Sequence, residues 1–154
     1  MRLSKGHKRR GMVVVMVALG LVVLMGMAAL SIDVGRIVLA VLRAQSVADA
    51  TAMAAALQLP DTASANPSLL AALAANNGTG SWPQLTVDTS QGVTYYGPGE
   101  TVPGYAVLDV KEYVATVTTH ADEEYTFARV SGADIMHVAR SATAKLILSH
   151  GALP

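Results

Sequence analysis

Residues 11–32, GMVVVMVALGLVVLMGMAALSI, decide the fold, because they form a run of 22 positions without a charged side chain. A helix of that length measures about 33 Å, and the hydrocarbon core of a bilayer is about 30 Å thick. Gly20 and Gly26 do not interrupt such a helix, since only internal hydrogen bonds satisfy the backbone in lipid. We therefore expect a transmembrane helix at 11–32.

The charges on either side of this stretch predict its orientation. All eleven acidic residues lie at Asp33 or beyond, whereas five of the eleven basic residues precede the stretch: Arg2, Lys5, Lys8, Arg9 and Arg10. Positive residues stay on the cytoplasmic side, so segment 1–10 is expected inside and the rest periplasmic or extracellular. This arrangement predicts a single-pass protein of the cytoplasmic (inner) membrane.

A cleaved secretory signal is the alternative interpretation of the same stretch. Such signals also combine a basic start with an apolar core, and Ala28 and Ala29 leave cleavage open. Their cores usually span about 7–15 residues, which is shorter than this run. The length therefore favours a retained anchor.

The composition of the remaining chain excludes several classes of function. Residues 33–154 contain six basic and eleven acidic side chains, a net charge of −5, which disfavours nucleic-acid binding. The chain has no cysteine, so disulfides, thiolate catalysis and cysteine-based metal sites are excluded. We expect no cofactor.

The helix is predicted to continue beyond the membrane, because no proline or turn cluster occurs before Pro60. This extension, 33–59, contains the alanine-rich sequence RIVLAVLRAQSVADATAMAAALQL. Its polar side chains are too few to coat a free helix, so much of it should be buried against its own domain or neighbouring subunits. Asp33 and Arg36 are spaced so that one helix face can bring them together.

Residues 60–154 are predicted to form a small α+β outer domain. Asn66 and Pro67 suit the start of a second helix that ends at Asn77 and Gly78. Its Leu69, Leu70 and Leu73 are expected to form one apolar stripe.

Alternating or apolar runs later in this domain predict a three- to five-stranded antiparallel sheet packed on the helix extension. The expected strands are 85–87, 93–96, 105–110, 113–119 and 135–148. Residues 122–130 are expected to form a short helix, with Asp122 as its cap and Phe127 as its core anchor.

Chemistry-bearing residues are scattered. The four histidines are His7, His120, His137 and His150. His120 lies near Asp122, Glu123 and Glu124, which could bind a hard cation, although a solvated helix start is the favoured interpretation. No Ser-His-Asp spacing or phosphate-binding loop stands out, so no catalytic, cofactor or metal residue is assigned. The aromatic residues Trp82, Tyr95, Tyr96 and Tyr105 are expected in the core or at the sheet edge, and an exposed cluster would indicate a contact patch.

The sequence resembles a known family in the order of its segments. An RRG sequence at 9–11 is followed by the apolar run and by SIDVGRIVLAVLRAQSVADATAMAAAL at 31–57. This order is similar to the N-terminal region of TadG-like and TadE-like proteins of Flp (Tad) pilus assembly. The residues that match the family pattern are Asp33, Gly35 and Arg36 of D-x-G-R, then Gln45, Ala48, Asp49 and Ala50 of the alanine-rich segment. The sequence FARVSGADIMHVARSATAKL at 127–146 also resembles the closing pattern of the family.

The resemblance implies a pilin-like domain and a non-enzymatic role in pilus assembly. Its partners would be the membrane and other pilus assembly proteins or pilin subunits, bound through the alanine-rich helix and the outer domain. Gly11 and Met12 form the possible prepilin peptidase site, but position 16 is methionine where processed members usually have glutamate. The unprocessed, TadG-like group is therefore the closer match.

Two other classes of function remain open. The first is a membrane-tethered module that binds a ligand or a cell-wall component, which an exposed cluster of aromatic and polar side chains would favour. The second is a tethered hydrolase, which would need a pocket with a nucleophile and a base in contact.

Overall fold

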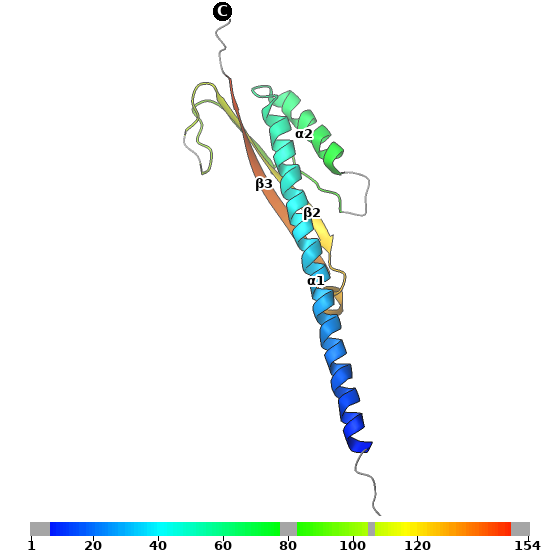
Figure 1. Ribbon diagram of the computed structural model, residues 1–154. Helices are drawn as coiled ribbons and strands as arrows, with labels where there is room; N and C mark the ends of the chain where they lie inside the picture. The colour runs from blue at the N-terminus through cyan, green and yellow to red at the C-terminus, as the bar shows by residue number, and fades with distance from the viewer. Residues whose placement is uncertain (1–6, 78–82, 105–106, 149–154) are drawn as a thin grey trace, which may run out of the picture. The chain divides into compact units, whose positions relative to one another are not determined.

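The computed structural model describes residues 7–77, 83–104 and 107–148. The elements follow the order α1 (His7–Ala56), α2 (Thr62–Asn77), β1 (Val93–Tyr96), β2 (Glu112–Glu124), the 3-10 helix η1 (Ala128–Ser131) and β3 (Ile135–Ile147) (Figure 1). The predicted α+β class, with a long N-terminal apolar helix, is confirmed.

The chain divides into two compact units. Unit 1 contains the described residues of Met1–Ile37 and Tyr125–Asp134, and unit 2 contains those of Val38–Glu124 and Ile135–Pro154.

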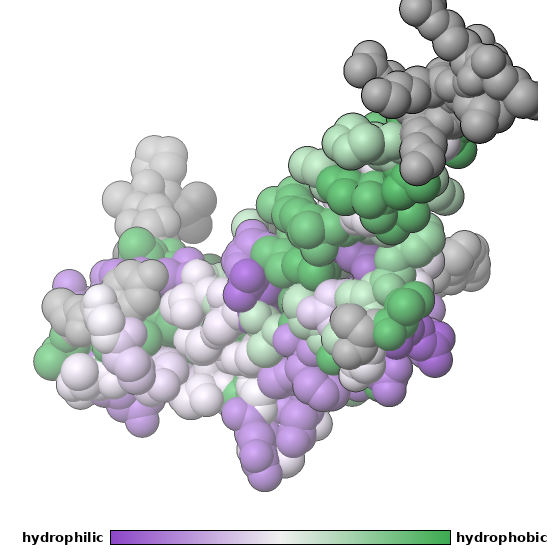
Figure 2. All heavy atoms as spheres, turned by 90° about the horizontal axis from the view of Figure 1, so that it is seen from below, coloured by the Kyte–Doolittle hydropathy of each residue, from purple (hydrophilic) through white to green (hydrophobic). Residues whose placement is uncertain are grey.

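The part of α1 in unit 1 presents an apolar surface. Every large apolar side chain from Met12 to Ile32 is more than half exposed. Figure 2 shows hydrophobic residues gathered along the visible side of this helix. The helix is long and apolar enough to cross a membrane. Side chains of this kind suit contact with lipid, because a soluble protein rarely exposes so large an apolar patch.

The first two helices meet earlier in the chain than expected. Helix α1 ends at Ala56 rather than Leu59, and α2 begins at Thr62 rather than Asn66. The early start of α2 follows from Asp61, whose carboxylate accepts hydrogen bonds from the Ala63 N–H at 3.1 Å and from the Ser64 hydroxyl. Asp61 therefore caps α2, and Pro67 lies inside the helix.

Among the described residues the sheet has three antiparallel strands in the order β1-β2-β3, within the predicted three to five. Strand β1 pairs with β2 from Val93↔Val117 to Tyr96↔Val114. Strands β2 and β3 pair over 13 positions, from Glu112↔Ile147 to Glu124↔Ile135. The expected strands 93–96, 113–119 and 135–148 therefore exist, although β2 extends further in both directions.

Two of the expected strands are wrong. Around residues 85–87 the chain forms only the isolated bridge Thr86↔His120, and around 105–110 only Thr101↔Val107. Tyr105 and Ala106 themselves lie outside the described residues. In each place one leucine, Leu85 or Leu108, is buried without a ladder forming, so local alternation overestimated the sheet.

The expected helix at 122–130 is also wrong. Residues 122–124 remain in β2, because Asp122, Glu123 and Glu124 pair with residues of β3. Only Ala128–Ser131 forms a 3-10 turn, and Gly132 ends it with a φ of 90°. Phe127, expected as a buried anchor, is 43% exposed. The acid-rich residues 122–124 resembled a helix start, but their pairing with β3 makes them part of a strand.

The core of unit 2 is built around small side chains of α1. A cluster of buried residues joins α1, α2 and the sheet: Ala48, Ala52, Ala55, Ala56, Leu59, Ala65, Leu69, Ala115, Val117 and Ala142. Alanine lets the sheet approach the helix closely, and the Thr119 hydroxyl donates a hydrogen bond to the Ala44 carbonyl at 3.0 Å. In α2, Leu69 and Leu73 are buried but Leu70 is 45% exposed, so the expected stripe has two leucines rather than three.

Candidate functional site

Asp33 is the first residue after the apolar stretch and is 4% exposed. One of its carboxylate oxygens, Oδ1, accepts the N–H of Thr126 at 3.0 Å. The other, Oδ2, accepts the N–H of Phe127 at 3.0 Å and that of Ala128 at 2.7 Å. We call this arrangement, Asp33 with the backbone of 126–128, the Asp33 clamp. It holds the segment between β2 and β3 against α1.

The electrostatics of the clamp favour the ionised carboxylate. Burial raises the pKa of Asp33, but the N–H groups of Ala128, Thr126 and Phe127, with the positive charge of Arg36, together lower it below its ordinary value of 3.8. Both oxygens of the ionised carboxylate are acceptors only, whereas protonation would turn one of them into a donor facing these N–H groups. Asp33 therefore acts as a charged structural link at neutral pH.

The other residues of the D-x-G-R pattern differ in what they contact. Arg36 donates a hydrogen bond to the hydroxyl of Thr126, so it reaches the same segment as Asp33. Gly35 is exposed, and a Cβ built there would meet nothing within 4 Å. The structure explains the aspartate and the arginine but offers no steric reason for the glycine.

The alanine-rich pattern residues lie in unit 2. Ala48 is fully buried in the core, and Ala50 is half-buried. Gln45 donates from Nε2 to Asp49 Oδ1 at 3.0 Å, a contact between neighbouring turns of α1. The possible processing residues Gly11 and Met12 both lie inside α1, with exposed side-chain positions.

Arg43 has a structural role that the sequence did not reveal. Its guanidinium donates to the carbonyl of Asn77, the last residue of α2, and to that of Pro83 at 3.1 Å. The amide of Asn77 in turn pairs with both backbone groups of Leu85 at 2.8 Å. A cation at the end of a helix satisfies carbonyls that have no partner within the helix. No local signal predicts this contact, because Arg43 and Asn77 are distant in sequence.

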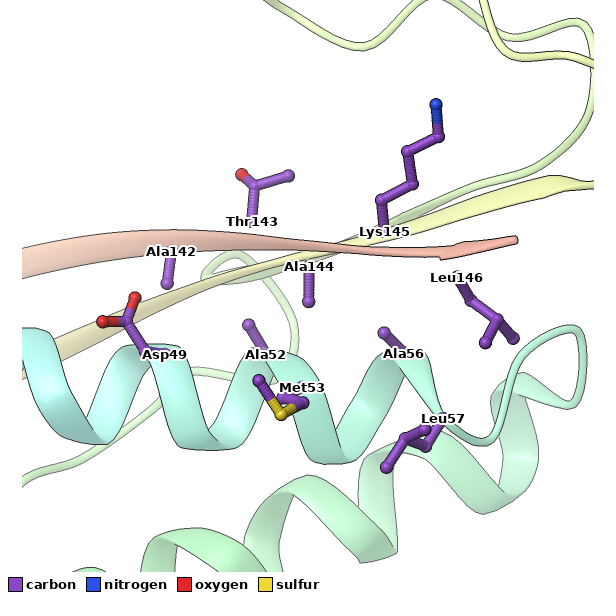
Figure 3. Close-up of a pocket in the computed structure, with 10 residues that line it drawn as sticks. All are labelled: Asp49, Ala52, Met53, Ala56, Leu57, Ala142, Thr143, Ala144, Lys145 and Leu146. Carbon is purple, nitrogen blue, oxygen red and sulfur yellow. The ribbon is translucent and has the colours of Figure 1, made fainter.

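An open groove lies between α1 and β3 in unit 2 (Figure 3). Its volume is about 450 Å³, and it is lined by Asp49, Ala52, Met53, Ala56, Leu57, Ala142, Thr143, Ala144, Lys145 and Leu146. Figure 3 shows Ala52 and Ala56 of the helix facing Ala142 and Ala144 of the strand, whereas Thr143 and Lys145 point to the other side of the sheet.

The edge of β3 beside this groove is open. Strand β3 is the last in the order β1-β2-β3, so within the described residues no strand pairs with its outer edge. Met53 and Leu57 of α1 are 61% and 67% exposed at the rim of the groove. An open strand edge next to an apolar groove is a surface that can accept another extended segment.

The acidic residues near His120 do not form one cluster. Asp122 faces the exposed side of β2, where its Oδ1 lies 2.6 Å from Nδ1 of His137, and Glu123 faces the buried side. In the part of the chain that the structure describes, no group of three or more His, Cys, Asp or Glu side chains converges.

Two of the expected core aromatics, Tyr95 and Tyr96, are half-buried. The other two, Trp82 and Tyr105, lie outside the described residues.

The fold therefore defines a protein with one membrane-length apolar helix that leads into a small α+β domain. Residues 11–58 match the model of the family described as "Putative Flp pilus-assembly TadE/G-like". This match confirms the resemblance over residues 11–58, which include Asp33, Arg36 and the alanine-rich segment. Comparisons with curated proteins and with solved structures found no match.

Proposed function

We propose that this protein is a membrane-anchored, non-enzymatic component of Tad/Flp pilus assembly, either a pseudopilin or an assembly protein. The observation that supports this proposal is the family match at residues 11–58, which covers both the apolar helix and its alanine-rich continuation. Residues 11–56 of this match belong to a single helix, α1, whose two parts suit two different environments.

The proposed topology follows from charge and hydropathy. Segment 1–10 lies in the cytoplasm, and 11–32 spans the cytoplasmic membrane. The helix extension 33–59 and the small domain 60–154 lie outside, in the periplasm or beyond. The basic residues before the span and the exposed apolar surface of α1 support this arrangement.

We propose that the anchor is retained rather than processed at Gly11. Met16 occupies the position where processed members usually have glutamate. Mass spectrometry of the N-terminus of the membrane-bound protein tests this proposal. A mature chain that starts at Met12 would contradict it.

The groove beside β3 is the proposed contact with another pilus component. An extended strand of that component would pair with the open edge of β3 and cover Met53 and Leu57. Backbone pairing would supply affinity, and the small residues Ala52, Ala56 and Ala144 would leave room for its side chains.

Deletion of the gene tests the role, and complementation tests the groove. Piliation and surface adherence should be lost on deletion and restored by the native chain. Met53→Lys with Leu57→Lys should not restore them, because two charges would enter the contact. Val110→Lys is the matched control, since Val110 is 84% exposed but does not line the groove. Normal piliation after deletion would refute the role, and full rescue by the double variant would refute only the groove contact.

A tethered binding module is the second candidate, and one observation favours it. A shallow pocket of about 330 Å³ in unit 2 is lined partly by Tyr95, Tyr96, Tyr113 and Glu100. Aromatic rings beside a carboxylate can hold a sugar ring and its hydroxyl groups. Purified full-length protein should then sediment with isolated cell-wall polymer, and Tyr96→Ala should reduce this binding. No sedimentation of the native protein would exclude this candidate.

A further inference from the structure

We propose that the segment Tyr125–Asp134 lies in the phospholipid headgroup layer of the membrane that α1 crosses. In this position Phe127 and Val130 would face the acyl chains, and the guanidinium of Arg129 would lie among the phosphates. This inference rests on the proposed membrane anchor and adds a second, loop-borne contact to it.

The Asp33 clamp determines the position of this segment. Asp33 directly follows the apolar stretch 11–32, and its oxygens lie 2.7–3.2 Å from the backbone nitrogens of 126–128. These nitrogens therefore lie within about one helical turn, roughly 5 Å, of the end of that stretch. If residues 11–32 occupy the hydrocarbon core, the clamped segment lies at the level where the core meets the headgroups.

The side chains of Tyr125–Asp134 suit the boundary between the hydrocarbon core and the headgroups. Val130 is 94% exposed and Phe127 is 43% exposed, although both are apolar. Arg129 carries an exposed guanidinium, 3.7 Å from the carboxylate of Asp134. Aromatic rings concentrate at membrane interfaces, and arginine can extend its apolar stem along lipid while its charge stays among the headgroups.

Val130 differs in its surroundings from Val110, the other highly exposed valine of a loop. Val110 is 84% exposed and stands between Asp109 and Lys111, with Glu112 next, a sequence suited to water. Val130 stands in a turn with Phe127 and is held at the end of the apolar helix. The two valines therefore form a matched pair with the same side chain and similar exposure.

Spin labelling of the full-length chain tests the proposal. Because the chain has no cysteine, Val130→Cys, Val110→Cys and Leu21→Cys each introduce one labelling site. The variants are reconstituted in vesicles of phosphatidylethanolamine and phosphatidylglycerol. The collision rates of the label with oxygen, which enters lipid, and with a water-soluble nickel chelate are then measured.

We expect the ratio of oxygen to nickel collisions to be highest at position 21. The ratio at 130 should be lower, yet severalfold higher than at 110. A label at 130 that behaves like the label at 110, while 21 reports lipid, would overturn the loop contact and leave the anchor intact. A label at 130 that is shielded from both reagents would indicate a protein contact and would also overturn the proposal. A label at 21 that behaves like 110 would refute the anchor itself.

The clamp provides a second measurement. Adding Asp33→Asn to the Val130→Cys variant should shift the label toward water, because the amide cannot replace the carboxylate as acceptor for three N–H groups. Adding Asp49→Asn should leave the label unchanged, since Asp49 is exposed and contacts Gln45 in the next turn. An unchanged label after Asp33→Asn would overturn the role of the clamp in placing the segment.

Discussion

At the residue scale, Asp33 connects the membrane-length helix to the segment between two strands. Its two oxygens accept the three consecutive N–H groups of 126–128, between the end of β2 and the first residue of η1. A charged acceptor makes these hydrogen bonds stronger than neutral ones. The aspartate of the D-x-G-R pattern thus has a physical role that does not involve catalysis.

The first prediction concerns this carboxylate. In full-length protein in lipid nanodiscs, Asp33→Asn should increase the rate of amide hydrogen exchange at 126–128 by roughly tenfold, because charge-assisted hydrogen bonds are lost. The measurement is hydrogen–deuterium exchange followed by mass spectrometry. Asp49→Asn serves as the control and should leave these amides unchanged. Equal exchange in both variants would show that the clamp does not protect the segment.

The second prediction concerns Asp61, the cap of α2. The Ser64 hydroxyl, together with the N–H groups of Ala63 and Ser64, lowers the pKa of Asp61 below 3.8 against the opposing effect of burial. A pKa lowered in the folded state stabilises the fold above the unfolded pKa, and this contribution disappears as the pH falls through the folded value. At pH 7, Asp61→Ala should therefore lower the melting temperature by several degrees.

The difference between native protein and Asp61→Ala should begin to shrink when the pH falls below about 4, where the carboxyl of the unfolded chain becomes protonated, and should shrink further as the pH falls through the lower pKa of the folded state. Thermal melting followed by circular dichroism measures both effects. Asp61→Asn keeps a capping oxygen and should retain most of the stability at pH 7. A difference that stays constant down to strongly acidic pH would contradict an electrostatic contribution from the cap.

At the scale of elements, α1 combines two surfaces that differ in the size and exposure of their apolar side chains. Its first part exposes large apolar side chains, whereas the part in unit 2 buries alanines against α2 and the sheet. Large side chains gain contact with lipid, and small ones allow close packing of a helix on a sheet. Helix α2 completes this core with Leu69 and Leu73, which lie one turn apart.

The third prediction uses two adjacent leucines of α2. Leu69 is fully buried, so Leu69→Ala should destabilise the outer domain by about 2–5 kcal/mol. Leu70 is 45% exposed, and Leu70→Ala should change the stability by about 0.5 kcal/mol or less. Proteolysis pulses at increasing urea, applied to the full chain in detergent micelles, measure both values. Similar losses in the two variants would indicate that Leu70 also packs in the core.

At the scale of the whole molecule, the uneven charge distribution is the property with the clearest consequence. The basic residues before the span and the net charge of −5 after residue 32 are separated by an apolar helix. Proteins keep such basic clusters in the cytoplasm, so in the proposed topology these charges set the direction of insertion.

The fourth prediction tests this orientation. Replacing Arg2, Lys5, Lys8, Arg9 and Arg10 with glutamine should produce a substantial inverted population, because the charge bias across the span is lost. Protease added outside intact spheroplasts should digest the outer domain of the native chain and leave the inverted fraction protected. Both proteins should remain in the membrane pellet after alkaline carbonate extraction. Full digestion of the variant would mean that other features determine the orientation.

The sequence by itself determined the features that depend on neighbouring residues. The apolar helix was predictable because its backbone satisfies its own hydrogen bonds and its side chains need only be apolar. Its alanine-rich continuation and the long strands near 113–119 and 135–148 were predictable from periodicity. Asp33 and Arg36 were also recognised as residues of the family pattern. The neighbouring sequence did not indicate which residues they contact.

The tertiary structure alone decided the contacts between distant segments. Residues 122–124 resembled a helix start, yet pairing with β3 made them a strand. The carboxylate of Asp33 accepts N–H groups from 126–128, and the guanidinium of Arg43 donates to the carbonyl of Asn77 at the end of α2. The partners of Asp33 and Arg43 lie more than 30 positions away along the chain, where propensity and spacing carry no information. Only the folded chain brings backbone N–H groups to the carboxylate of Asp33 and backbone carbonyls to the guanidinium of Arg43. A charge as buried as that of Asp33 requires such partners.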